Sequence, residues 1–211
     1  MHRALHIRLP PESLELFFMK TQNDTEVFYP NNIRSWRKWL EKNHLSKQSV
    51  WLVFYNKSSG RKTITWSEAV DVALAYGWID SKKVKIDGET AHQFFSRRKP
   101  KSTWSKINKD KVERLMAEGK MTKAGLEAIE MAKQNGSWSV LDEVETLTIP
   151  NDLEKAFRKV GGSKKFFLGL SKSVRKAMLQ WVVLARRPET RKKRIEEIAG
   201  QAGKQLKPKQ F

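Results

Sequence analysis

The chain has 211 residues, a formal net charge of +19 at pH 7 and no cysteine. This length suits one domain or two small domains that bury a core without disulfide bonds or metal ions. The absence of cysteine excludes a disulfide framework, thiolate metal sites and cysteine nucleophiles.

The amino-terminal region, residues 1–25, shows no sustained hydrophobic periodicity and contains the breaker Pro10-Pro11. We predict a flexible arm here. Its longest apolar run, residues 16–19, is far too short for the core of a signal peptide or for a membrane-spanning helix. The sequence therefore predicts a cytoplasmic protein without a transmembrane segment.

Residues 26–148 are predicted to form an α+β domain. A short extended piece at residues 26–29 precedes a helix over about residues 33–43, in which apolar side chains recur every three to four positions after the capping pair Asn31-Asn32. Residues 50–55 form a continuous β-branched and aromatic run, which is typical of a buried strand.

A second helix is predicted to begin at the capping box of Thr65 and Glu68, with Trp66 on its apolar stripe. Gly77 is well placed to end this helix in a left-handed conformation. The chain then turns into a strand, and Asp87-Gly88 is the turn signal of a β-hairpin. We expect a small sheet of three or four strands, mainly antiparallel.

Beyond residue 102 the pattern becomes helical. One helix, ending near Gly119, carries Ser105 and Asn108 on the same face as apolar residues. A second helix, which presents Leu126 on its apolar face, follows and ends by Gly136.

A boundary is predicted at residues 149–152, where a proline and two capping-type residues precede a new apolar stripe. Residues 149–211 then form a basic, all-helical domain. The fold class is therefore α+β: a small, mainly antiparallel sheet with packed helices, followed by an all-helical carboxy-terminal unit.

Functional side chains gather between residues 77 and 108, without the spacing that core packing alone requires. The hairpin brings Asp80 toward Arg97-Arg98, where an arginine can pair with the carboxylate or hold an anionic ligand beside it. Trp78 and Trp104 offer faces for a planar or cationic group. The alternatives are a structural ion pair and two core tryptophans.

Ser105 and Asn108 are polar residues on an inward face, so each needs a loop carbonyl or a ligand as a partner. A helix start favours anions, and Ser102 there is either a cap or an anion contact. Together these observations predict a binding pocket for a small anionic or aromatic ligand. The residues of this predicted pocket are Trp78, Asp80, Arg97, Arg98, Trp104, Ser105 and Asn108.

Catalytic motifs are poorly represented. The four histidines are scattered and lack paired metal-ligand spacing, and there is no glycine-rich phosphate loop or G-x-S-x-G elbow. We therefore predict no catalytic residue, no metal site and no cofactor, and favour a binding protein over an enzyme.

The carboxy-terminal end is strongly basic: residues 151–211 carry 17 basic and 5 acidic side chains. A helix with this composition would contact phosphates without reading bases, which makes a nucleic-acid-associated protein the alternative function. A solvated basic face that serves solubility is the simpler interpretation. The residues of the predicted nucleic-acid surface are Arg186, Arg187, Arg191, Lys192, Lys193 and Arg194.

Several motifs, taken in order, resemble a known family. They are residues 36–40 (Trp-Arg-Lys-Trp-Leu), 50–55 (Val-Trp-Leu-Val-Phe-Tyr), 77–81 (Gly-Trp-Ile-Asp-Ser), 119–126 (Gly-Lys-Met-Thr-Lys-Ala-Gly-Leu) and 187–195 (Arg-Pro-Glu-Thr-Arg-Lys-Lys-Arg-Ile). From residue 26 to its end the chain resembles the bacteriocin-protection, YdeI or OmpD-associated family. The resemblance implies a role in stress or antimicrobial-peptide protection, and it implies no particular reaction or ligand.

Overall fold

The computed structural model describes residues 25–211, which divide into two compact units. Unit 1 comprises residues 25–102 and Asp110–Met131, and unit 2 comprises Thr103–Lys109 and Ala132–Phe211. The flexible arm predicted for residues 1–25 lies outside the described residues, apart from its last residue. The predicted domain boundary between residues 148 and 149 stays a prediction.

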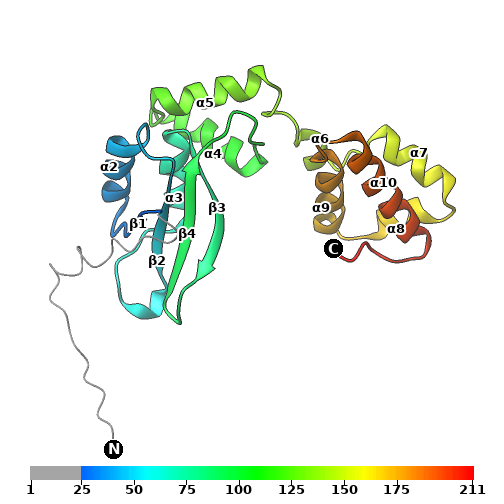
Figure 1. Cartoon of the computed structure of the whole chain (residues 1–211), viewed down its shortest axis with the longest axis horizontal. Helices are drawn as coiled ribbons and strands as arrows, with labels where there is room; N and C mark the ends of the chain where they lie inside the picture. Colours follow the sequence, from blue (N-terminus) through cyan, green and yellow to red (C-terminus); the bar gives the residue numbers. More distant parts are fainter. Residues whose placement is uncertain (1–24) are drawn as a thin grey trace, which may run out of the picture. The chain divides into compact units, whose positions relative to one another are not determined.

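Unit 1 contains a sheet of four strands in the order β1-β2-β4-β3 (Figure 1). Strand β1 runs parallel to β2, and the other neighbouring strands are antiparallel. This topology confirms the predicted small, mainly antiparallel sheet. The strands are β1 (Val27–Phe28), β2 (Ser49–Tyr55), β3 (Trp78–Lys85) and β4 (Thr90–Arg97).

Local sequence signals account for much of unit 1. Asn32 and Thr65 both form capping boxes, at the starts of α2 (Ile33–Asn43) and α3 (Trp66–Ala75). Asp87 accepts two backbone N–H bonds in the turn between β3 and β4, which confirms the predicted hairpin. The remaining helical elements are η1 (Lys57–Ser59), α4 (Lys106–Ala117) and α5 (Lys123–Gln134).

Aromatic side chains join α2 to one face of the sheet. The Trp36 and Trp39 rings stack with centroids 5.3 Å apart. Trp36 meets Phe95 of β4 edge to face at 5.6 Å, and Trp39 meets Trp78 of β3 in the same way at 5.7 Å. Edge-to-face pairs add a directional term to the burial of large apolar surfaces, so these contacts fix how α2 lies on the sheet.

The other face of the sheet carries a second apolar cluster, which contains Trp51, Val53 and Tyr55 of β2. The ammonium group of Lys82 lies 5.0 Å from the ring centroid of Trp51 and 5.8 Å from that of Phe94. Lys82 belongs to β3, the last strand in the sheet order, where Lys83 and Lys85 are also exposed. Cations therefore cover part of this aromatic face and mark the β3 edge.

Trp66 and Leu126 were predicted to lie in the core, and both predictions are wrong. Trp66 is 48% exposed and Leu126 is 40% exposed. Trp66 is the first residue of α3, where the chain enters from outside the core, and its indole N–H donates instead to Asp80 at 2.8 Å. Helical spacing identified the stripe correctly, but it could not locate where along the helix the core begins.

A close approach between helices fixes α5 against the end of α3. Thr122 donates both its backbone N–H and its hydroxyl to the carbonyl of Ala75, at 3.0 and 2.6 Å. A Cβ added at Gly125 would collide with this carbonyl oxygen. Gly77 adopts φ +72° as predicted, and a Cβ there would lie 2.9 Å from the carbonyl oxygen of Ala124. The two glycines therefore allow backbone to pack on backbone.

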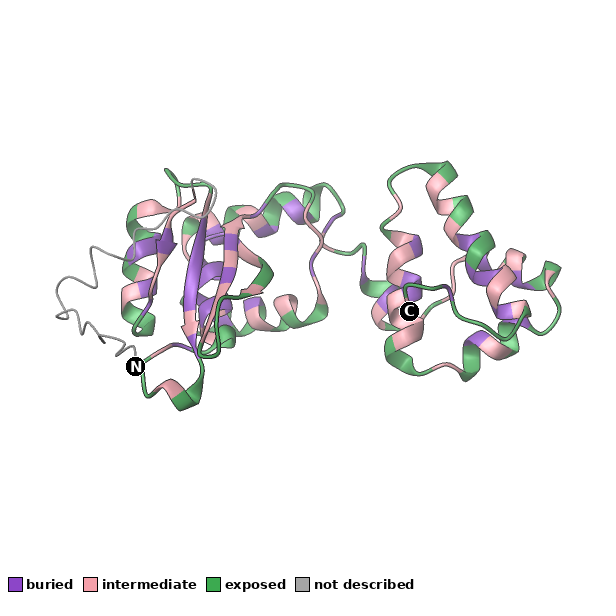
Figure 2. Cartoon of the chain, turned by 60° about the horizontal axis from the view of Figure 1, so that its bottom comes forward, coloured by how far each residue is buried: buried purple, intermediate pink, exposed green. Residues whose placement is uncertain are grey.

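Unit 2 is helical, as predicted, and buries a continuous apolar core. Buried residues line the facing sides of its helices (Figure 2). The short α6 was not predicted, because four residues are too few to show periodicity. The helices that lie entirely in unit 2 are α6 (Asp142–Glu145), α7 (Asn151–Lys159), α8 (Ser163–Gly169), α9 (Lys172–Val183) and α10 (Pro188–Gly203).

The close approach at Gly125 yields the first prediction. Gly125→Ala should lower the free energy of unfolding by about 1–3 kcal/mol, because the added methyl group overlaps a backbone carbonyl that cannot move freely. Urea denaturation measures the change. Gly88→Ala is the matched control, since a Cβ at Gly88 meets no atom within 4 Å. Equal stability of the two variants would show that α3 and α5 are not in close contact.

Candidate functional site

Trp78 and Arg97 of the predicted pocket are opposite partners across β3 and β4. Both side chains donate to the same acceptor, the carbonyl of His44 that follows α2: Trp78 through Nε1 at 3.3 Å, and Arg97 through Nε and Nη2 at 3.2 and 3.0 Å. Arg97 also donates to the carbonyl of Leu45. Their polar groups thus satisfy carbonyls at the carboxyl end of a helix, a favourable place for a cation.

Asp80 lies opposite Phe95, one pleat along from Trp78. Its Oδ2 accepts hydrogen bonds from the indole of Trp66 at 2.8 Å and from the amide of Gln93 at 3.2 Å. Arg98 is only 9% exposed. Burial lowers the pKa of the Arg98 guanidinium to about 9, and the nearby Asp80 carboxylate offsets part of that shift. The sheet therefore places a carboxylate and a buried cation close enough to interact.

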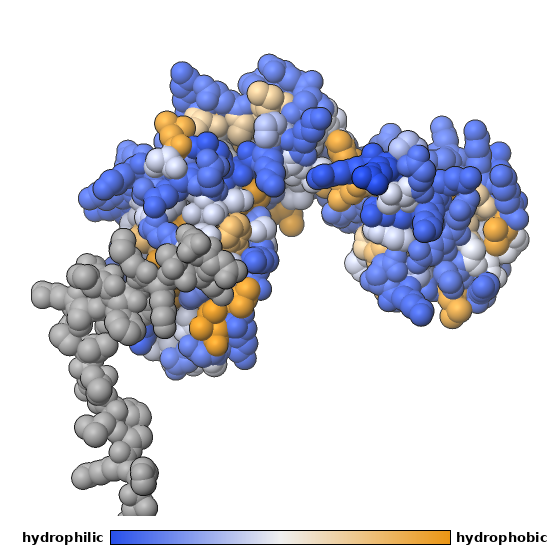
Figure 3. All heavy atoms as spheres, viewed as in Figure 1, coloured by the Kyte–Doolittle hydropathy of each residue, from blue (hydrophilic) through white to orange (hydrophobic). Residues whose placement is uncertain are grey.

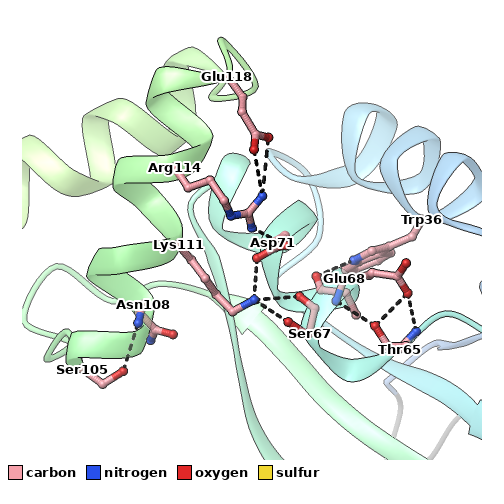
Figure 4. A network of polar contacts seen from close by, with 11 residues as sticks. Trp36, Thr65, Ser67, Glu68, Asp71, Ser105, Asn108, Lys111, Arg114 and Glu118 are labelled. Atoms are coloured by element: carbon pink, nitrogen blue, oxygen red, sulfur yellow. Dashed lines mark hydrogen bonds and ion pairs between the residues drawn. The ribbon is translucent and has the colours of Figure 1, made fainter.

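The remaining residues of the predicted pocket belong to unit 2. Trp104 is 1% exposed, and its ring centroid lies 5.0 Å from that of Trp138. The expectation that Ser105 is an inward helical residue is wrong: α4 begins at Lys106, and the Ser105 hydroxyl accepts the N–H of Asn108 at 3.3 Å (Figure 4). Ser105 therefore caps the helix.

The predicted pocket thus draws on both units, with Trp78, Asp80, Arg97 and Arg98 in unit 1 and Trp104, Ser105 and Asn108 in unit 2. Within each unit, Trp78, Asp80, Arg97 and Ser105 make hydrogen bonds to the chain itself. The ligand-binding role of these seven residues stays a prediction.

An ionic network between α3 and α4 went undetected in the sequence. Asp71 pairs with Lys111 and with Arg114, each at 2.6 Å, and Arg114 also reaches Glu118 at 3.2 Å (Figure 4). The hydrogen bonds that Arg114 donates to the carboxylates of Asp71 and then of Glu118 raise the pKa of Arg114. Lys111 and Arg114 lie 40 and 43 residues after Asp71 in the sequence, so no local spacing could reveal these pairs. We interpret the network as structural.

Two members of the predicted nucleic-acid surface serve the fold of unit 2. Arg191 forms a two-point pair with Asp152, with Nε–Oδ2 at 2.6 Å and Nη2–Oδ1 at 3.0 Å. Arg194 donates to the carbonyl of Trp181 at 2.6 Å and lies over the Trp181 ring, 5.0 Å from its centroid. Neither guanidinium is fully available to an external partner.

The other basic residues of this surface are more available. Lys192 has only a long contact with Glu196, at 4.0 Å. Arg186, Arg187 and Lys193 are exposed, and within residues 25–211 they have no carboxylate partner. Arg186 and Arg187 line a hollow of about 370 Å³ between the loop after α9 and the first turns of α10, together with Leu184, Thr190 and Arg194.

The start of α10 opens beside this hollow. Its N-cap residue is Arg187, and no side chain caps the first turn, which begins at Pro188. Free backbone N–H groups at a helix start favour anions, whereas basic side chains there are electrostatically unfavourable. The arrangement suits an external anion.

Residues 25–211 contain neither a cluster of metal ligands nor a membrane-spanning helix. Within these residues, no three histidine, cysteine, aspartate or glutamate side chains come together as a metal site would require. The helices there are all too short or too polar to cross a lipid bilayer.

Family comparisons divide the chain. Residues 146–204 match the model of the bacteriocin-protection, YdeI or OmpD-associated family. Residues 28–128 match a different model, a domain of unknown function (DUF8412). The family segment therefore covers α7 to α10 and not, as the motifs predicted, the whole chain from residue 26. The search of curated proteins and the search of solved structures gave no match.

The contacts of Arg97 yield a test of its role. Arg97→Lys keeps the charge but loses the planar fork that reaches the carbonyls of His44 and Leu45. We expect a loss of about 0.5–1.5 kcal/mol in the free energy of unfolding, measured in urea. The exposed neighbour Lys99 provides the control Lys99→Gln, which should change little. An Arg97→Lys variant as stable as the parent protein would argue against the structural role.

The pair of Asp152 and Arg191 in the family segment predicts a pH effect. Hydrogen bonds from Arg191 lower the pKa of the Asp152 carboxyl below its usual value of 3.8. Because the folded pKa is the lower one, the pair stabilises the protein above about pH 4, and this stabilisation is lost as the pH falls through the folded pKa.

Urea denaturation at pH 7 and at pH 3 should therefore show a smaller acid-induced loss of stability in Arg191→Gln than in the parent protein. Arg158→Gln removes one charge from the same unit but leaves the Asp152 pair intact, so it should behave as the parent does. An unchanged acid response in Arg191→Gln would contradict the assignment.

Proposed function

We propose that this protein is a non-enzymatic, cytoplasmic binding protein whose unit 2 binds the phosphates of nucleic acid. The observation that carries the proposal is the hollow between the loop after α9 and the first turns of α10, lined by Arg186, Arg187, Thr190 and Arg194 at the uncapped start of α10. A guanidinium group can bind a phosphate through two parallel N–H···O hydrogen bonds, and a helix start adds free backbone N–H donors. A phosphate in this hollow would neutralise the positive charge gathered there.

Charge distribution supports a polyanion as the partner. Residues 151–211 contain 17 basic and 5 acidic side chains, so they carry +12 of the total of +19. The face of unit 2 visible in Figure 3 is mostly hydrophilic. Contacts of this kind release the condensed counterions of nucleic acid and do not read base sequence. The expected binding is therefore strong at low salt and insensitive to sequence.

The alternative, a pocket for a small anionic or aromatic ligand, receives less support. The Trp78 indole and the Arg97 guanidinium already donate to backbone carbonyls after α2. Replacing those bonds by bonds to a ligand would take the donors away from the half-buried carbonyl of His44, which costs free energy. Arg186 and Arg187 of unit 2 are exposed, so they can bind a ligand without giving up a hydrogen bond that holds the fold.

The family model that matches residues 146–204 is described as bacteriocin-protection, and this description is consistent with the proposal if the protein does not bind the peptide directly. Antimicrobial peptides of the amphipathic type are rich in lysine and arginine. A protein with a net charge of +19 repels such peptides, so direct capture of the peptide is electrostatically unfavourable. We therefore propose that any protective role operates through an anionic partner of the protein.

A salt titration tests the proposal. Fluorescence anisotropy with a labelled DNA duplex should show affinity falling steeply between about 50 and about 200 mM salt. The double variant Arg186→Gln/Arg187→Gln should reduce the slope of log K against log salt by about 2, since each lost phosphate contact contributes about 0.9. We expect an affinity loss of about tenfold or more at low salt.

The matched control is Lys165→Gln/Lys172→Gln, which removes the same charge from exposed positions on α8 and α9. This control should keep most of the slope. If both double variants lose the same affinity, binding depends on net charge alone and the hollow has no special role. Absence of any salt-dependent binding in the parent protein would refute the function itself.

A further inference from the structure

A groove runs between α7 and α10 in unit 2, and the residues of α10 that line it differ from those that line the proposed nucleic-acid hollow. Its volume is about 500 Å³. All of its lining residues fall inside the family segment, residues 146–204. The residues that matter for its shape and charge are Lys155, Ala156, Lys159, Lys192, Ile195 and Gly200.

The groove is closed at both ends. At one end the Asp152 carboxylate on α7 holds the guanidinium of Arg191 on α10. At the other end the two helices touch, since a Cβ added at Gly203 would collide with Val160 just beyond α7. The first turn of α7 therefore contacts the first turn of α10, and the end of α7 contacts the end of α10. The two helices run in the same direction, with the groove between these contacts.

Small residues create the hollow. Ala156 on α7 and Ala199 and Gly200 on α10 leave space where larger side chains would fill the crevice between two packed helices. A Cβ added at Gly200 meets no atom within 4 Å. The floor also includes Ile195, which is 6% exposed and belongs to the core of unit 2. The floor is therefore apolar and rigidly supported.

The rim carries positive charge that is not neutralised. Arg191 has Asp152 as its partner, and Lys192 has a long contact with Glu196. Lys155 and Lys159 are exposed, and among residues 25–211 they have no carboxylate partner. They stand at i and i+4 on α7, where like charges are neighbours and destabilise the helix. An external pair of carboxylates would remove this repulsion.

We infer that the groove between α7 and α10 is a docking site for an acidic peptide segment of a partner protein, with an apolar side chain on the floor and carboxylates on Lys155 and Lys159. The volume suits one or two side chains, well within the range of specific sites. This inference does not depend on nucleic-acid binding at Arg186 and Arg187.

Other occupants fit less well. The lysines on the rim attract phosphate as well as carboxylate, but the apolar floor offers nucleic acid nothing to bury: none of the lining residues is aromatic, so bases have nothing to stack on. A basic peptide would meet two unpaired lysines. An acidic peptide can place a leucine-sized side chain on the apolar floor and its carboxylates beside the lysines of the rim.

The experiment uses the full chain and fluorescein-labelled peptides of about twelve residues, the length of a short helix in a groove. A set of peptides carries one leucine and a glutamate pair at varied spacing, and each peptide has a counterpart with glutamine in place of glutamate. We expect at least one acidic peptide to bind about tenfold or more tightly than its glutamine counterpart. Equal binding across all pairs would overturn the inference.

Gly200→Leu tests the position of the site. The leucine side chain fills the groove without a clash at Cβ, and we expect it to weaken peptide binding by about tenfold or more. Gly169→Leu is the matched control, because a Cβ there also meets nothing within 4 Å and Gly169 ends α8, outside the groove. Unchanged affinity in Gly200→Leu would refute docking between α7 and α10.

Lys155→Gln/Lys159→Gln tests the rim and should reduce affinity for the acidic peptide, with Lys165→Gln/Lys172→Gln as the charge-matched control. Competition with the DNA duplex separates the two sites: DNA binding should survive Gly200→Leu, and peptide binding should survive Arg186→Gln/Arg187→Gln. If Gly200→Leu abolishes DNA binding and leaves peptide binding intact, the groove belongs to nucleic acid and the inference is wrong.

Discussion

The contact between the carbonyl of Ala75 and the segment of Thr122 and Gly125 controls the geometry of unit 1. It ends α3, seats α5 on that end, and leaves Gly77 in the left-handed conformation from which β3 departs. The position of Trp78, and through it of the loop after α2, follows from this turn. Because the backbone at Gly125 packs directly on the Ala75 carbonyl, there is no space for a side chain between them, and the two helices cannot shift to accommodate one.

Sequence reasoning succeeded where the signal was local. The helix cap at Asn32, the capping box at Thr65, the turn at Asp87 and the left-handed Gly77 each depend on residues within four positions of one another. Trp66 was predicted to be buried but is exposed, because periodicity identifies a face and does not show how far along the helix the core extends. Ser105 was placed one residue inside α4, within the usual uncertainty of a helix boundary. The pairing of Asp71 with Lys111 needed the tertiary fold.

The same limit applies to the candidate sites. Composition located the basic end of the chain, but it could not separate arginines that hold the fold from arginines that face solvent. Arg191 and Arg194 contact Asp152 and Trp181, and Arg187 remains exposed. The groove between α7 and α10 was undetectable for a related reason: it depends on two helices that are distant in sequence and on side chains that are small at their crossing.

The row of lysines on β3 bears on how this protein behaves at high concentration. Strand β3 ends the sheet, and an unpaired strand edge is a template on which another chain can add a strand. Lys82, Lys83 and Lys85 place charge along that edge, and Lys82 also shields the rings of Trp51 and Phe94. A second copy that approached edge to edge would bring like charges together, so the lysines disfavour pairing of β3 with another chain.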